Sequence, residues 1–79
     1  MAEVISIVKM NTGETGKIVG LNGGAGMVKK MENMGIKIGS RIKKISQQIM
    51  NGPVVISQGN TQIGIGRGIA QKIMIEIEP

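Results

Sequence analysis

The 79-residue chain contains no cysteine, no histidine and no aromatic residue. Without cysteine it can form neither a disulfide framework nor a thiolate metal site. Without histidine it has no imidazole to activate a nucleophile or to bind a transition metal. The missing aromatic rings also exclude the aromatic-lined grooves that bind proline-rich peptides. We therefore expect no enzyme, no cofactor, and a core made of isoleucine, valine and methionine.

Positive charge is concentrated in the middle of the chain. The net charge is +5, and the central segment carries six cations against one acid, Glu32. Such a cluster is typical of a surface that meets an anionic partner or a membrane. It is equally typical of a solvated face, where lysine also discourages strand pairing. No apolar run approaches the roughly 20 residues of a membrane helix, and no signal peptide opens the chain. We expect one cytoplasmic domain, residues 1–79.

The chain is organised around one short amphipathic helix at residues 26–34. At helical spacing Met27, Val28, Met31 and Met34 share a face, which predicts that this face packs on a sheet with Met31 and Met34 buried. Gly35 follows where a helix C-cap favours a residue without a β-carbon, so we expect it to have positive φ.

The remaining sequence predicts short strands and turns. Isoleucine and valine runs bounded by glycine, asparagine or proline are typical of strands. Turn chemistry marks residues 11–14, 51–53 and 59–60, and residues 69–72 predict one helical turn. Strands are expected at 16–21, 40–49, 53–58, 61–65 and 73–77, with residues 4–8 a further strand or an extended lead-in.

Two local patterns predict irregular strands. Ile42 and Ile45 are three residues apart, so both can face inward only if the strand bulges near residues 43–44. Glycines alternate at positions 64, 66 and 68, which predicts that a curved strand passes close to another backbone. The glycine-rich loop before the helix lacks the lysine and Ser/Thr of a P-loop, and we expect it to bind no phosphate.

These elements predict a mainly β fold. We expect a small barrel of about five strands with one inserted short α-helix. An open antiparallel sheet covered by the helix is the alternative. The barrel is preferred because it leaves no edge strand exposed in so β-rich a chain.

Several short motifs together resemble the FeoA family, the small ferrous-iron transport proteins A and the related domains of some metal-dependent repressors. The motifs are the run GETGKIVGLNGG at 13–24, MENMGI at 31–36, Gly39, Gly52-Pro53, and the tail from Ile63 to Ile75. The resemblance covers residues 10–77. Methionine replaces the usual leucine at positions 31 and 34, and Gly66, Gly68 and Ile69 stand where the family is commonly polar or charged.

The resemblance implies an SH3-like β-barrel and a role in ferrous-iron uptake. It implies a cytosolic accessory module that docks on the cytosolic region of a membrane iron(II) transporter bearing a G-protein domain. The module would not span the membrane and would be at most peripheral to its inner face. Self-association is left open, and nucleic acid is not an expected partner.

The expected partner surface combines the basic cluster with one apolar residue. Ile69 is either a contact residue on an exposed turn or a plug at one end of the barrel. The candidate residues are Lys29, Lys30, Lys37, Arg41, Lys43, Lys44, Arg67 and Ile69.

Two other functions are weaker. A basic nucleic-acid-binding barrel would use the same lysines, but it would lack stacking platforms, each worth roughly 1–3 kcal/mol per base. Direct iron binding would need oxygen or nitrogen ligands, and only five glutamates are present. Glu76 and Glu78 share a strand face but are more typical of a solvated strand end. The methionine spacing is that of core packing.

Overall fold

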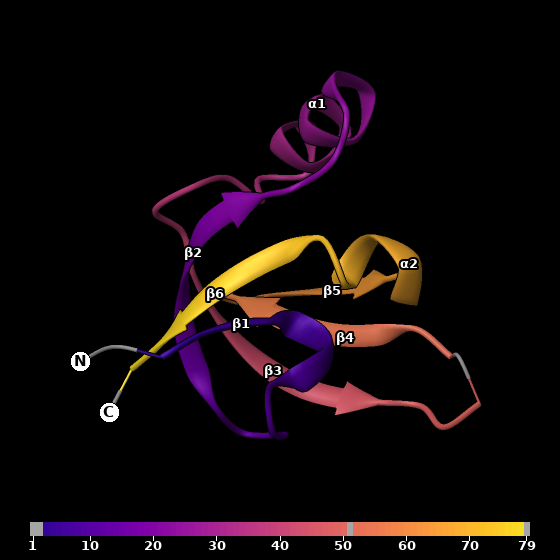
Figure 1. Cartoon of the computed structure of the whole chain (residues 1–79). Coiled ribbons are helices and arrows are strands. Elements are labelled where there is room, and N and C mark those ends of the chain that lie inside the picture. Colours follow the sequence, from indigo (N-terminus) through magenta and orange to yellow (C-terminus); the bar gives the residue numbers. More distant parts are fainter. Residues whose placement is uncertain (1–2, 51, 79) are drawn as a thin grey trace.

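A computed structural model describes residues 3–50 and 52–78 of the chain. They form a six-stranded antiparallel sheet with one nine-residue helix beyond its end (Figure 1). The strands, in the sheet order β1-β6-β2-β3-β4-β5, are β1 (Val4–Ser6), β6 (Ile73–Ile77), β2 (Thr15–Leu21), β3 (Arg41–Gln47), β4 (Val54–Gln58) and β5 (Thr61–Ile65). The helices are α1 (Ala25–Asn33), the four-residue α2 (Arg67–Ala70) and a 3-10 turn, η1 (Ile7–Lys9). The predicted mainly β class is confirmed.

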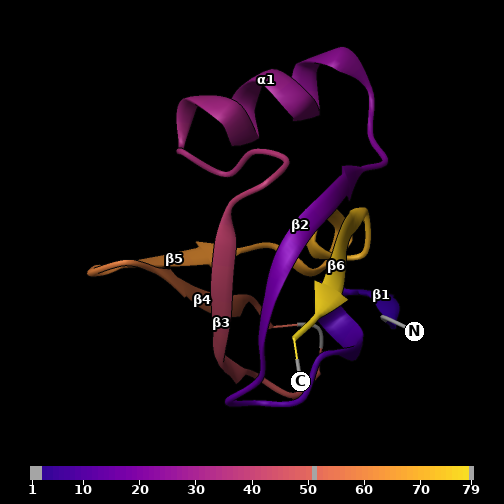
Figure 2. The ribbon, with the colours of Figure 1, turned by 90° about the vertical axis from the view of Figure 1, so that its left-hand side faces the viewer.

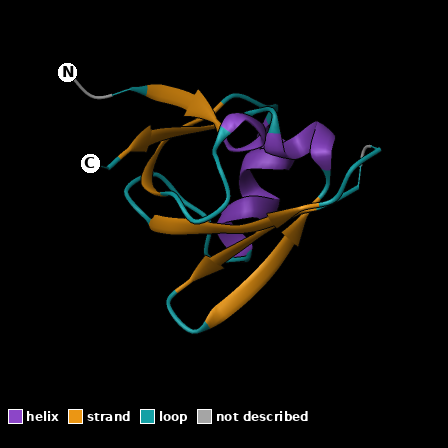
Figure 3. Cartoon of the chain, turned by 90° about the horizontal axis from the view of Figure 1, so that it is seen from below, coloured by secondary structure: helices purple, strands orange, loops and turns teal. Residues whose placement is uncertain are grey.

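The predicted closure into a barrel is wrong, because the sheet remains open. Within the described residues β1 and β5 each pair on one side only. The sheet still curls strongly (Figure 3), helped by register shifts between Ile18 and Gly20 and between Lys44 and Ser46. β1 ends after three residues, where η1 begins, and β5 ends just before α2. The two edge strands therefore do not pair with each other to close a barrel.

Buried aliphatic side chains from β2 to β6 meet in one core with Met10 and Met31, and Ile5 of β1 packs against it. The alternation predicted for the last strand is confirmed, since Ile73 and Ile75 are fully buried. The buried apolar residues are Ile7, Met10, Ile18, Met31, Ile36, Ile42, Val54, Ile56, Ile65, Ala70, Ile73 and Ile75. None of the helices described is long and apolar enough to span a membrane.

The end of α1 is fixed by a Schellman motif. Gly35 has φ +85°, as predicted, and its N–H donates to the Glu32 carbonyl at 3.0 Å. The N–H of Ile36 donates to the carbonyl of Met31 at 2.8 Å. These two bonds satisfy carbonyls that a helix end otherwise leaves unpaired, and the buried side chains of Met31 and Ile36 close the motif. The helix then lies across the ends of β2 and β3 (Figure 2).

Only part of the methionine face is buried. Met31 is 2% exposed, as predicted, but Met34 is 39% exposed. Met34 occupies the C-cap position, where the chain leaves the helix, so its side chain does not follow the buried stripe. The prediction that Met34 is buried is therefore wrong.

The glycines at positions 64, 66 and 68 are not points of close approach, so that prediction is also wrong. A β-carbon added at any of them would meet no heavy atom of the described residues within 4 Å. The close approach occurs instead at Gly16 in β2, where an added β-carbon would lie 2.8 Å from the carbonyl oxygen of Glu76.

We expect Gly35→Ala to lower the free energy of unfolding by about 1–2 kcal/mol, because an L-residue is strained at positive φ. The new β-carbon would also lie 3.3 Å from Gln58 Nε2, which donates to the Gly35 carbonyl at 2.8 Å. Urea unfolding followed by circular dichroism measures the change, since the chain has no fluorescent aromatic residue. Gly26→Ala, within α1, is the control and should stabilise by roughly 1 kcal/mol. Equal effects of the two changes would contradict the prediction.

Candidate functional site

An apolar groove of about 130 Å³ lies between the C-terminal half of α1 and the segment joining β5 to α2. Its walls are aliphatic and methionine side chains, and the bare backbone of two glycines forms part of the lining. Lys30 supplies positive charge at its rim. The lining residues are Lys30, Met31, Met34, Gly64, Ile65, Gly66 and Ile69. We call this the Met–Ile groove, and it is the principal candidate site.

Ile69 and Met34 supply the exposed apolar surface of the Met–Ile groove. Ile69 is half-buried and packs partly against the core, while the rest of its side chain lines the groove. The sequence left open whether Ile69 is a plug or a surface residue, and its side chain is partly each. Met34, at the C-cap of α1, is open to solvent on the opposite wall.

Lys44 does not belong to an exposed surface, and this corrects its place among the predicted partner residues. It is 2% exposed and points into the molecule from β3. Its ammonium donates to the carbonyls of Ile7, Val8 and Met10 at 3.0, 3.1 and 2.7 Å, and to Gln47 Oε1. Four acceptors surround three N–H donors, so every donor has a partner. The residue ties the end of η1 to the sheet.

The surroundings of Lys44 disfavour its charged form and so lower its pKa. Burial lowers the pKa of Lys44 below its ordinary value, and the positive charge of Arg67 lowers it further. Glu14 acts in the opposite direction. No carboxylate of residues 3–50 and 52–78 bonds to the ammonium, so the three backbone carbonyls and Gln47 Oε1 stabilise it.

The other basic residues are spread over separate places. Lys29 and Lys30 are exposed on α1, Lys37 on the loop after it, and Lys43 on β3. Arg41 binds Glu78 through two hydrogen bonds, Nε to Oε1 at 2.9 Å and Nη2 to Oε2 at 2.6 Å.

The sequence predicts solvated carboxylates at Glu76 and Glu78, but Glu78 forms an ion pair with Arg41. Hydrogen bonding to Arg41 lowers the pKa of Glu78 and raises that of Arg41. Both carboxylate oxygens of Glu78 accept hydrogen bonds from Arg41. No group of three potential metal-ligating side chains exists among the described residues.

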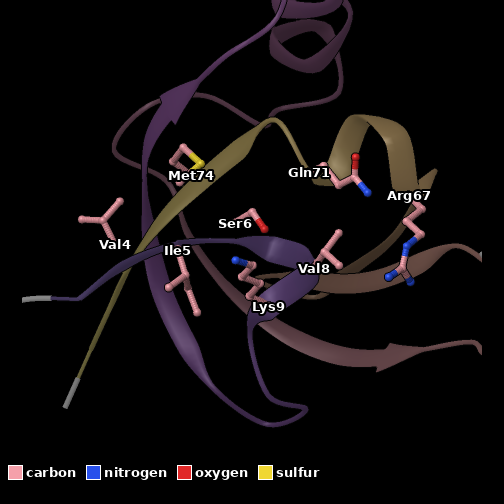
Figure 4. Close-up of a pocket in the computed structure, with 8 residues that line it drawn as sticks. All are labelled: Val4, Ile5, Ser6, Val8, Lys9, Arg67, Gln71 and Met74. Atoms are coloured by element: carbon pink, nitrogen blue, oxygen red, sulfur yellow. The ribbon is translucent and has the colours of Figure 1, made fainter.

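A second, larger hollow of about 520 Å³ runs beside β1 and η1 at the opposite edge of the sheet (Figure 4). Arg67 and Lys9 contribute its cations. Arg67 therefore faces away from the Met–Ile groove, although Ile69 is only two residues further on. The lining residues are Val4, Ile5, Ser6, Val8, Lys9, Arg67, Gln71 and Met74.

Of the eight predicted residues, the structure brings only Lys30 and Ile69 into the Met–Ile groove. The groove also contains Met31, Met34, Gly64, Ile65 and Gly66, which the sequence does not predict as site residues. Met34 is predicted to be buried, and the glycines are predicted to mark a close approach of another backbone. The alternating glycines at positions 64, 66 and 68 could have indicated the groove. They have neither positive φ nor a close neighbour among the residues that the structure describes, and they leave the backbone surface uncovered.

The small, open, curled β-sheet with one nine-residue helix defines the SH3-like class of fold. The FeoA domain model matches residues 5–77, so the chain belongs to the FeoA domain family. The resemblance seen in the sequence is thereby confirmed.

Individual relatives agree with this family. The chain is 48% identical over 56 residues to the "Putative Fe(2+) transport protein A" of Methanocaldococcus jannaschii, a match that spans 71% of this chain and 66% of that protein, just under two thirds. It is also similar to the crystal structure of an iron uptake regulatory protein (FeoA), with a TM-score of 0.88, 30% identity, and coverage of 96% and 100% of the two chains. A manganese-dependent transcriptional repressor shares the fold, with a TM-score of 0.87 and 16% identity over 99% of this chain and 44% of that one.

Proposed function

We propose that the protein is a cytosolic accessory module of ferrous-iron uptake. It docks on the cytosolic region of a membrane iron(II) transporter that carries a G-protein domain, and it modulates that transporter without catalysing a reaction. Membership of the FeoA domain family supports the link to iron uptake, as does the name of the archaeal relative. Docking would bring the module to the inner face of the membrane without inserting it.

The observation that carries the docking proposal is the Met–Ile groove. A groove with aliphatic walls and a charged rim is typical of a surface that receives an apolar side chain of a protein partner. Met34 suits this role, because the flexible thioether chain adapts to the shape of a partner. Met34 is 39% exposed, so a partner can reach its side chain.

We expect Met34→Ser to weaken binding to the transporter's purified cytosolic region about tenfold, which corresponds to about 1.4 kcal/mol. Isothermal titration calorimetry measures the dissociation constant. Val19→Ser on β2 is the matched control, because Val19 is 37% exposed, nearly the same as Met34 at 39%, but lies outside the groove lining. Equal affinities for the two variants would exclude the Met–Ile groove. An undetectable interaction of the unaltered protein would exclude the docking function.

A further inference from the structure

β5 is an edge strand without the usual protection against pairing. Within residues 3–50 and 52–78 it pairs with β4 alone. Its five residues, TQIGI, include neither charge nor proline, and the β4–β5 register runs without a bulge from Val54↔Ile65 to Gln58↔Thr61. Lysine, proline, a bulge or extreme shortness normally blunts such an edge. The opposite edge strand, β1, has only three residues and ends in η1.

The turn before β5 determines which backbone groups point outward. Gly59 has φ +61°, which fits the first central position of a two-residue II′ turn closed by the Gln58↔Thr61 pair. Hydrogen-bonded and non-hydrogen-bonded pairs alternate from that pair onward. Ile63 and Ile65 therefore exchange hydrogen bonds with β4, while the N–H and C=O groups of Gln62 and Gly64 point away from the sheet.

The glycines beside this edge have no role in the fold that requires glycine. Gly64, Gly66 and Gly68 have no positive φ, and a β-carbon at each would find open space among the described residues. Glycine in a strand commonly marks a place where another backbone approaches closely. No heavy atom in the described part of the chain would lie within 4 Å of a β-carbon at these positions, so the bare backbone is available to a partner.

The Met–Ile groove adjoins this bare edge, since Gly64 and Gly66 belong to its lining. Its volume of about 130 Å³ suits one aliphatic side chain, as an apolar cavity of about 150 Å³ suits one benzene. Lys30 is the cation among the residues that line it. Positive charge there, and the net charge of +5, favour an acidic partner segment over a second copy of the chain.

We propose that an extended, acidic segment of the partner adds as a seventh strand to the outer edge of β5. The backbone groups of Gln62 and Gly64 bond to the added strand. One aliphatic side chain of that strand enters the Met–Ile groove, and a carboxylate beside it meets Lys30. Strand addition draws affinity from main-chain hydrogen bonds and specificity from side-chain pockets. This inference rests on the docking function proposed above and specifies how the docking occurs.

Two changes at one residue test the added strand. Proline at position 64 removes the outward N–H and places a ring at the edge, while it spares the bonds between β5 and β4. We expect Gly64→Pro to weaken binding of the transporter's purified cytosolic region at least tenfold. Gly64→Ala keeps the N–H, and its β-carbon would meet no described heavy atom within 4 Å, so this variant should bind more tightly than Gly64→Pro.

Hydrogen exchange of the unaltered protein gives a second readout that does not depend on the folding of the proline variant. The Gly64 amide should exchange at least tenfold more slowly in the complex than in the free protein. If the unaltered complex forms without this protection, or if Gly64→Pro binds as well as Gly64→Ala, strand addition is wrong but docking stands. If the unaltered protein does not bind, both proposals fail. Protection of Gly64 in a dimer of the protein alone would identify a second copy as the occupant and overturn the proposed partner.

Discussion

Replacing Lys44 by methionine should lower the free energy of unfolding by about 3 kcal/mol. Methionine fills nearly the same volume but brings no donor to the carbonyls of Val8 and Met10, and each buried acceptor without a partner costs roughly 1–3 kcal/mol. The Ile7 carbonyl is less affected, since it also accepts from the Met10 N–H at 3.1 Å. For a domain of this size, with a total stability of about 4–12 kcal/mol, the loss is large.

The adjacent residue provides the control for this prediction. Lys43 is exposed on the same strand, so Lys43→Met should change the free energy of unfolding by no more than about 0.5 kcal/mol. Urea unfolding by circular dichroism compares the two variants. Similar midpoints would show that the carbonyl cage around Lys44 does not stabilise the fold. Lys44→Glu should prevent cooperative folding, because a carboxylate would face the same oxygen atoms.

The sequence predicted strand β3 correctly but predicted that Lys44 is exposed. Strand periodicity alone puts Ile42 and Lys44 on the same face, and the structure buries both. The sequence predicts a bulge near residues 43–44 because a bulge there lets Ile42 and Ile45 both face inward. The register shift in fact falls between Lys44 and Ser46, one step later. Only the fold brings the three carbonyls of segment 7–10 within reach of the ammonium, so no local pattern could reveal this exception.

Local signals were reliable where local physics decides the structure. The turn at Gly59, the C-cap at Gly35 and the alternation of β6 all follow from backbone or side-chain preferences within a few residues. Closure of the sheet and the Met–Ile groove depend on how distant segments pack. The groove joins α1 to residues 64–69, some thirty positions further along the chain, and its shape could not be derived from either segment alone.

Replacing Gly16 by valine should destabilise the fold by about 3 kcal/mol or more. Gly16 lies in β2, a central strand that pairs with β3 through Ile42 and with β6 through Ile77. A β-carbon at this position would collide with the Ile75 side chain and lie 2.8 Å from the carbonyl oxygen of Glu76. A flexible side chain could move aside, but a backbone oxygen in a paired strand moves only if the two strands separate. Overpacking of this kind costs about 1–3 kcal/mol for small insertions, and valine adds three carbons.

The matched control lies four residues further along the same strand. A β-carbon at Gly20 would lie 3.5 Å from Met74 Cβ, an ordinary van der Waals contact. Gly20→Ala should therefore be neutral or stabilise by up to about 1 kcal/mol, since alanine reduces the freedom of the unfolded chain. Gly16→Ala should destabilise despite that same gain. Neither glycine has positive φ, so any difference between the two alanine variants measures the contact between β2 and β6 and not backbone strain. Equal urea midpoints for the two would mean that β2 and β6 can part at Gly16 without loss of stability.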